Sequence, residues 1–318
     1  MFDSAGKYGA GLSLEVLGKI LKELGADGDQ IIVSNKLGWK RIPLDPLLKV
    51  PTFEGSPCIW KDIEHDAVQE ISYDGVLSCF HQGNDLLGFV SEVVSIHDPE
   101  EYIAAGGDSK GRARCRQDIL DAYRALFELK SKGVVKHIGI GSKSVEVVED
   151  ICRSVQLDWV MIACSYTIYR HPDATRSVLR RLHNEGVTII NAAVFHAGFL
   201  LGGDYFDYEK ADETASPALF DWRRRFHAVC SEFNVAPVSA CIQFPFLFCG
   251  NCISSVALNP GSIQHIREYV SVVASLEGSD VSDSTNVSNG TCTGTGTSDI
   301  PAEFWVKLRE CNLIQVQN

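Results

Sequence analysis

Residues 138–164 read IGIGSKSVEVVEDICRSVQLDWVMIAC, and this segment indicates the architecture of the whole chain. A β-branched run at 138–141 is followed by Ser144, a residue type that often caps a helix, and then by Val147, Val148 and Ile151 at helical spacing. A second apolar run, Trp159 to Cys164, follows. The order predicts two parallel strands joined by a helix.

The same alternation continues on both sides of this unit. The further strands are expected at 31–34, 90–96, 188–192 and 253–258. The further helices are expected near 13–24, with Ser13 as its cap, and near 119–126, 178–182, 226–233, 262–270 and 302–311. Strand–helix repeats favour a parallel sheet, and no strand is followed by the G-x-G-x-x-G spacing of a doubly wound dinucleotide-binding fold. We therefore predict a TIM (β/α)8 barrel that spans residues 1–318 as a single domain.

Composition and charge exclude several classes of protein. Acidic residues outnumber basic ones 41 to 29, so the net charge of −12 disfavours binding to nucleic acid. No apolar run reaches about 18 residues, and the opening Met1-Phe2-Asp3-Ser4 shows neither the basic nor the apolar region of a secretory signal. We therefore expect no secretory signal, no membrane partner and a cytoplasmic location. The eleven cysteines, including the pair Cys249-Gly-Asn-Cys252, are then expected as reduced thiols, and no metal site is predicted.

Two segments depart from the repeat. Residues 40–66 contain four prolines and are expected to form a long loop. Residues 277–299 are rich in Gly, Ser, Thr, Asn and Asp and contain almost no large apolar side chain. Such a composition cannot bury enough surface to offset the entropy of ordering, so we predict a low-complexity disordered insertion there.

Four polar residues follow the first readable strands and point to chemistry. Asp3 and Tyr8 lie in the opening segment, Lys36 ends the strand that starts at Ile31, and His97 ends the strand that starts at Val90. In a barrel, this rim of strand ends is where active sites are built. A free tyrosine has a pKa of about 10. A nearby ammonium makes such a phenol a better acid, a carboxylate holds that ammonium in place, and a histidine orients a substrate oxygen.

At these residues the chain resembles the aldo-keto reductase family. The segment Phe2-Asp3-Ser4-Ala5-x-x-Tyr8-Gly9 is similar to that family's first signature, and Lys36 and Ile96-His97-Asp98-Pro99 match its lysine and histidine segments. Further similarity covers 191–200 and the loop Asn259-Pro260-Gly261-Ser262. The closing segment 300–305 is most like the aldose dehydrogenase branch of the family. The resemblance covers nearly the whole chain apart from 277–299.

The resemblance implies an NAD(P)-dependent oxidoreductase that transfers hydride between a nicotinamide cofactor and an aldose or other small aldehyde or alcohol. It implies that Tyr8 donates or accepts the proton, Lys36 tunes Tyr8, Asp3 pairs with Lys36, and His97 orients the substrate. The implied cofactor-binding residues are Ser142, Asn191, Gly261, Ser262 and His265. NAD is favoured over NADP because the loop lacks an arginine often used to clamp a 2′-phosphate, although Arg267 is close.

The beginning of the chain departs from the family pattern. Members normally carry an N-terminal hairpin and a first barrel strand before the segment that corresponds to Phe2-Asp3. We therefore expect a barrel that lacks the hairpin and that strand, which would leave strand edges unpaired. This leaves an alternative function open, a catalytically impaired or non-catalytic cofactor-binding barrel that serves as a regulatory subunit or is a truncated copy. The sequence does not indicate the oligomeric state.

Overall fold

The computed structural model describes residues 1–26, 31–47, 63–277 and 300–315. The chain divides into two compact units, residues 1–161 and 162–318. The predicted disordered insertion falls outside the described residues, except for Glu277, which ends a helix. The single-domain expectation stays a prediction.

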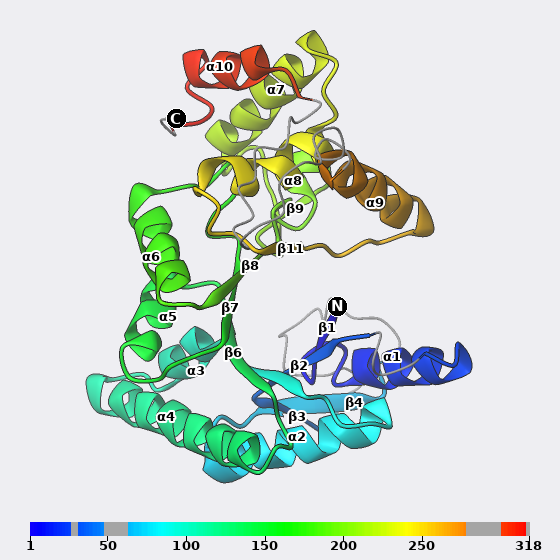
Figure 1. The fold of residues 1–318 in the computed structure, drawn as a ribbon, viewed down its shortest axis with the longest axis vertical. Helices are drawn as coiled ribbons and strands as arrows, with labels where there is room; N and C mark the ends of the chain where they lie inside the picture. The colour runs from blue at the N-terminus through cyan, green and yellow to red at the C-terminus, as the bar shows by residue number, and fades with distance from the viewer. Residues whose placement is uncertain (27–30, 48–62, 278–299, 316–318) are drawn as a thin grey trace, which may run out of the picture. The chain divides into compact units, whose positions relative to one another are not determined.

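Four parallel strands form the centre of the first unit (Figure 1): β1 (Phe2–Ala5), β2 (Val33–Leu37), β5 (Val93–His97) and β6 (His137–Ser142). β1 pairs with β2, β2 with β5, and β5 with β6, in parallel each time. Every residue of β2 is buried, as expected for a parallel sheet covered on both faces. The strands expected at 31–34 and 90–96 both begin and end later than predicted.

The helices of the first unit are α1 (Leu12–Glu23), α2 (Tyr73–Leu87), α3 (Pro99–Ala105), α4 (Ser109–Ser131) and α5 (Val145–Cys152). α2 packs between α1 and α4, and α3 packs on α4. Ser144 caps α5 as predicted, since its Oγ accepts a hydrogen bond from the Val147 amide. Ser13 does not cap α1. That helix begins after Gly11, and the Ser13 Oγ instead accepts a hydrogen bond from Ser4.

An antiparallel hairpin replaces both ends of the expected long loop. β3 (Trp39–Pro43) pairs with β4 (His65–Gln69), so the prediction of a loop over 40–66 is wrong at its two ends, and residues 48–62 lie outside the described residues. Pro43 stands at the last position of β3, where a missing amide donor costs little. The hairpin also meets the turn after β1, because a Cβ on Gly6 would lie 2.2 Å from the Trp39 carbonyl oxygen.

The second unit continues the strand–helix repeat. Its parallel pair is β8 (Thr188–Ala192) and β11 (Ser255–Ala257), and a short antiparallel pair consists of β9 (Tyr205–Phe206) and β10 (Glu209–Lys210). Its helices are α6 (Asp173–Asn184), the 3-10 turn η1 (Phe199–Leu201), α7 (Pro217–Glu232), α8 (Pro237–Phe248), α9 (Ile263–Glu277) and α10 (Ala302–Glu310). Cys249 and Cys252 form a disulfide, so the expectation of reduced thiols is wrong for this pair.

The strand order confirms the predicted fold class. β7 (Trp159–Ala163) contains the division between the units, and the described sheet has the order β1-β2-β5-β6-β7-β8-β11. Seven strands in sequence order, with helices between most of them, are the pattern of a TIM-like α/β barrel. The expectation that the barrel lacks an N-terminal hairpin and a first strand stays a prediction. None of the described helices combines the length and the hydropathy that crossing a bilayer requires.

Candidate active site

The four residues predicted to carry chemistry come from one edge of the first unit's sheet. Asp3 lies on β1, Lys36 on β2 and His97 at the end of β5, while Tyr8 follows in the turn between β1 and α1. The register places Ala5 beside Lys36 and Lys36 beside Ser95. Because neighbouring parallel strands end at the same edge, side chains far apart in sequence converge there.

Asp3 and Lys36 form a partly buried ion pair. The Lys36 Nζ donates to one carboxylate oxygen of Asp3, and the Ser34 hydroxyl donates to the other. Lys36 is only 3% exposed. Burial alone would lower the pKa of Lys36, but the charges of Tyr8 and Asp3 and hydrogen bonds to both raise it above its ordinary value. The lysine therefore stays an ammonium across the physiological pH range.

Tyr8 contacts both this ammonium and His97. The Lys36 Nζ is 4.7 Å from the centroid of the Tyr8 ring, and the ring centroids of Tyr8 and His97 are 5.4 Å apart in an edge-on arrangement. The lysine stem passes close to β6, where a Cβ on Gly141 would lie 2.8 Å from the Lys36 Cδ. The structure thus brings all four predicted residues together.

His97 is buried and stays neutral. Burial and the positive charges of Lys36 and Lys7 hold the pKa of His97 well below its usual range. Its Nδ1 is buried and has no hydrogen-bond partner among the described residues. Its Nε2 lies 3.6 Å from the Asp98 Oδ2, which is too long for a strong hydrogen bond. Within the described part of the chain, one imidazole nitrogen at the predicted catalytic edge is therefore without a hydrogen-bond partner.

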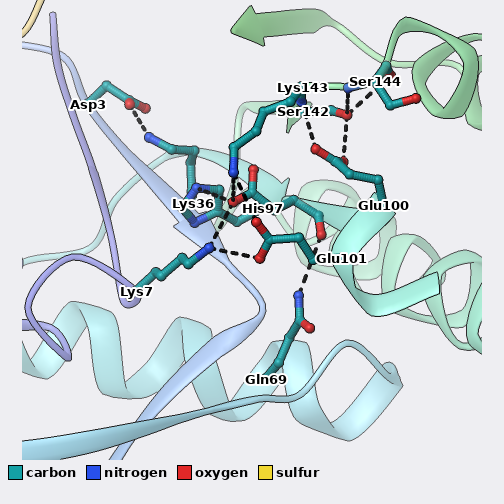
Figure 2. A network of polar contacts seen from close by, with 11 residues as sticks. Asp3, Lys7, Lys36, Gln69, His97, Glu100, Glu101, Ser142, Lys143 and Ser144 are labelled. Atoms are coloured by element: carbon teal, nitrogen blue, oxygen red, sulfur yellow. Dashed lines mark hydrogen bonds and ion pairs between the residues drawn. The ribbon is translucent and has the colours of Figure 1, made fainter. Parts of the chain in front are cut away.

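A network of ion pairs lies next to His97 (Figure 2). The Lys7 Nζ lies 3.1 Å from the Asp98 Oδ2 and 2.8 Å from the Glu101 Oε2. The Lys143 Nζ lies 2.9 Å from the other oxygen of Glu101 and 3.8 Å from the Asp98 Oδ2. The sequence patterns for the catalytic residues did not include Lys7, Glu101 or Lys143. For Lys7, the sequence offered one signal, namely that it directly precedes Tyr8.

Ser142, a predicted cofactor-binding residue, ends β6 and is hydrogen-bonded to the carboxylate of Glu100 (Figure 2). Its hydroxyl donates to the Glu100 Oε2 at 2.6 Å, and the Lys143 amide donates to the Glu100 Oε1 at 2.7 Å. Burial raises the pKa of Glu100, although these two hydrogen bonds act in the opposite direction. The donors at this strand end are thus occupied by a side chain of α3.

The other predicted cofactor residues lie in the second unit. Asn191 is fully buried on β8, where its Nδ2 donates to the Tyr166 carbonyl at 2.7 Å and its Oδ1 has no partner among the described residues. Gly261, Ser262 and His265 are exposed at the beginning of α9, and the Ser262 Oγ accepts from the His265 amide. An exposed helix N-terminus suits a phosphate, so Gly261, Ser262 and His265 fit a phosphate of a nicotinamide dinucleotide.

A second buried polar cluster lies at the ends of β7 and β8, and sequence analysis missed it. The His196 Nδ1 lies 2.5 Å from the Asp207 Oδ1, and its Nε2 lies 2.7 Å from the Thr167 Oγ1. Asp207 also accepts from the Arg170 guanidinium at 2.9 Å. Cys164, His196 and Asp207 could approach one metal ion, but here their polar atoms bind one another and Arg170. The expectation of no metal stays a prediction.

An α/β barrel with ionisable side chains gathered where its strands end is a common framework for enzymes. Residues 1–285 match the sequence profile described as "Aldo/keto reductase family". The chain belongs to the aldo/keto reductase family. Membership supports nicotinamide-dependent oxidoreduction of aldehydes or sugars.

Relatives and solved structures agree with this assignment. The chain is 27% identical to pyridoxal 4-dehydrogenase of Microbacterium luteolum and 26% identical to D-threo-aldose 1-dehydrogenase of a Pseudomonas species; both alignments cover 98% of this chain and 84% of the relative. An aldo-keto reductase from Bacillus halodurans, in its holo form, superposes with a TM-score of 0.58 at 17% identity, covering 85% of this chain and 76% of that one. That likeness shows the fold.

Proposed function

We propose that this chain is an NAD(P)-dependent dehydrogenase or reductase of aldoses or other small aldehydes and alcohols, with Tyr8 as its proton donor and acceptor. The observation that carries the proposal is the contact of Tyr8 with both the Lys36 ammonium and the His97 ring. A bound nicotinamide supplies or accepts the hydride. Ser142, Asn191, Gly261, Ser262 and His265 are the residues that would hold it.

The chain's own residues divide the remaining work. In the direction of reduction, the carbonyl oxygen gains negative charge and takes the proton from the Tyr8 hydroxyl. The Lys36 ammonium next to that hydroxyl stabilises the phenolate left behind, and Asp3 keeps the ammonium in place. Neutral His97, whose Nδ1 has no hydrogen-bond partner among the described residues, orients the substrate oxygen by a hydrogen bond.

The names of the relatives supply the substrate panel. D-threo-aldoses, L-galactose and pyridoxal are the first compounds to test, because relatives named for them align over most of the chain. We further propose that the chain belongs to the aldose dehydrogenase branch of the family. We also propose that it uses NAD in preference to NADP. A cytoplasmic location also stays a prediction.

The test compares the wild-type chain with the Tyr8→Phe variant, following reduced nicotinamide by absorbance. Loss of the hydroxyl should lower kcat by about 10²–10⁴-fold, the usual contribution of general acid–base catalysis. Cofactor affinity, measured by fluorescence, should be nearly unchanged because Tyr8 is assigned to proton transfer. A folded Tyr8→Phe variant with wild-type turnover would show that Tyr8 is not the acid.

One observation favours the alternative, a cofactor-binding barrel without catalysis. The Ser142 hydroxyl and the Lys143 amide already bind Glu100, so two donors at the predicted cofactor edge are occupied. The same experiment separates the two functions. Cofactor binding by wild-type chain without turnover on any compound of the panel supports the alternative, whereas turnover that depends on Tyr8 excludes it.

A further inference from the structure

Lys7 connects the segments that carry two of the proposed catalytic residues. It precedes Tyr8 in the turn after β1, and Asp98 follows His97 at the end of β5. The Lys7 Nζ lies 3.1 Å from the Asp98 Oδ2, so an ion pair joins the immediate neighbours of Tyr8 and His97. Sequence separation between the partners is large, so only the fold brings them together.

The ion pair is buried on both sides. The side chains of Lys7 and Asp98 are 10% and 7% exposed. The same ammonium binds the Glu101 Oε2 at 2.8 Å and lies 5.0 Å from the centroid of the Trp39 ring. Removing such charges from water is costly, and buried ion pairs are often no more stabilising than apolar residues of the same volume. A buried ion pair therefore suggests a role in fixing geometry.

Asp98 is held in an unusual backbone conformation by the end of the sheet. Its φ is 47°, in the left-handed region. Its amide donates to the Gly141 carbonyl at 2.8 Å, and its carbonyl accepts from the Glu101 amide at 3.0 Å. Left-handed conformation is costly for most residues but tolerated by aspartate. The carboxylate that receives Lys7 is thus anchored to β6 and α3, and Lys7 fastens the Tyr8 turn to that anchor.

We propose that Lys7 is a positioning residue that sets the distance and angle between the Tyr8 and His97 rings through its ion pairs with Asp98 and Glu101. This inference rests on the proposed function, since it gives Lys7 a role in that same site. Lys7 does not touch the reacting atoms in the proposal. It acts through the two segments that it joins.

Lys143 provides a matched control. It binds the same Glu101, at 2.9 Å, and lies 3.8 Å from the same Asp98 oxygen, but it follows β6 and adjoins neither Tyr8 nor His97 in the chain. Both ammoniums disfavour protonation of His97. Replacing each with methionine removes one charge from the same network, although the Lys143 side chain is 40% exposed and the Lys7 side chain only 10%. The comparison therefore shows whether the loss of one positive charge near His97 is by itself enough to lower kcat.

The test measures kcat, KM and cofactor affinity for Lys7→Met, Lys143→Met and Lys7→Arg in the full chain. Misplacement of a reacting group by about 1 Å can cost about 10²-fold in rate. We expect kcat of Lys7→Met to fall by about 10–100-fold at unchanged cofactor affinity, kcat of Lys143→Met to stay within about threefold, and Lys7→Arg to recover most of the loss. Equal losses in the two methionine variants, or no recovery with arginine, would overturn the proposal.

A second measurement does not depend on turnover. The edge-on contact of Tyr8 with His97 shifts the NMR resonances of the His97 ring protons, so those resonances report the geometry of the pair. The His97 ring resonances should shift from their wild-type positions in Lys7→Met and stay at those positions in Lys143→Met. All spectra are compared at a pH where His97 is neutral. The groups that face His97 from its surroundings are Tyr8, Lys36, Lys7, Asp98, Glu101 and Lys143.

The two readouts separate failure of this inference from failure of the proposed function. An inactive wild-type chain contradicts the proposed function, and the NMR comparison then decides the positioning role alone. Unmoved His97 resonances in Lys7→Met overturn the positioning role whether or not the chain is active. In the Tyr8→Phe background, Lys7→Met should lower the residual kcat by less than about threefold, because residues that act as a unit are non-additive.

Discussion

His97 and His196 are both buried at strand ends, one in each unit, and they differ in how their ring nitrogens are bonded. Both nitrogens of His196 have side-chain partners, Asp207 and Thr167. The Nδ1 of His97 has none among the described residues. Burial lowers the pKa of both rings, so both are neutral near pH 7, and only the bonding distinguishes them.

The difference indicates which of the two described polar clusters keeps a hydrogen-bonding group that is not bonded within the cluster. A buried polar group without a partner is costly, so its persistence favours a role with a ligand. A cluster whose polar atoms all bind one another holds its own loops together. His196 is also stacked on Phe206, with 4.7 Å between the ring centroids. We therefore propose catalysis for the His97 region and structural support for the His196 region.

The most direct test of the two proposed roles is to replace each histidine with glutamine. His97→Gln should lower kcat/KM by about 10²-fold or more, since it removes a group that binds the reacting oxygen. His196→Gln should keep turnover per folded molecule within about threefold. Activity assays normalised to the folded fraction measure both, and a larger activity loss in His196→Gln contradicts the assignment.

Stability should show the opposite order. His196→Gln removes two buried hydrogen bonds and a stacked ring, so the free energy of unfolding should fall by about 2 kcal/mol or more. Asp207→Asn should also destabilise. Burial alone would raise the pKa of Asp207, but His196, Cys164 and Arg170 lower it to about 2, so the native state requires the carboxylate. Urea unfolding at pH 7 measures both, with exposed Asp204→Asn as the control; a value equal to the control contradicts a structural role.

The pH dependence of stability sharpens the comparison further. Because the pKa of His97 is lower in the folded state, the unfolded chain binds the proton first as pH falls below about 6.5. The contribution of His97 is therefore fully present above that pH and is lost below it, with a slope of up to about 1.4 kcal/mol per pH unit. His97→Gln should unfold with a shallower acid dependence than wild type. Parallel curves between pH 6.5 and 5 would mean that His97 binds its proton as readily in the folded state as in the unfolded state.

The smallest expected effect concerns the choice of cofactor. KM for NAD should be lower than KM for NADP, because no arginine precedes Arg267 in the loop at the beginning of α9. Arg267→Ala should leave KM for NAD within about twofold, since a neutral ribose hydroxyl needs no cation. Steady-state kinetics with both cofactors tests this, and a preference for NADP that disappears in Arg267→Ala would reverse the proposed order.

Sequence patterns predicted the elements whose periodicity is strong and failed where it is hidden. α8 is buried on nearly all sides, so it shows no amphipathic period, and α2 was missed although Val76, Cys79, Phe80 and Leu87 have helical spacing. The hairpin of β3 and β4 was hidden by the prolines between its strands. Pairing across such a separation is a tertiary property that local propensity does not contain.

The candidate site divides in the same way. Asp3, Tyr8, Lys36 and His97 could be predicted because strand ends and a family signature mark them, and the structure brings them together. The ion pairs of Lys7 and the cluster around His196 could not be predicted, because the partners lie on other elements. The position of Lys7 beside Tyr8 in the chain does not identify those partners. The grouping of charges around one histidine emerges only from the register of the sheet.

The contact of Glu100 with the end of β6 has a consequence for cofactor affinity. If Ser142 binds the cofactor as proposed, binding is an exchange in which the cofactor replaces one carboxylate and Glu100 moves into water. The measured dissociation constant then equals the intrinsic one divided by the fraction of molecules in which Glu100 has already left. Because burial raises the pKa of Glu100, acid weakens its hold on the two donors by neutralising it. The cofactor would then compete with the Glu100 carboxylate for the same donors. Because mild acid neutralises that carboxylate, it would tighten cofactor binding rather than weaken it.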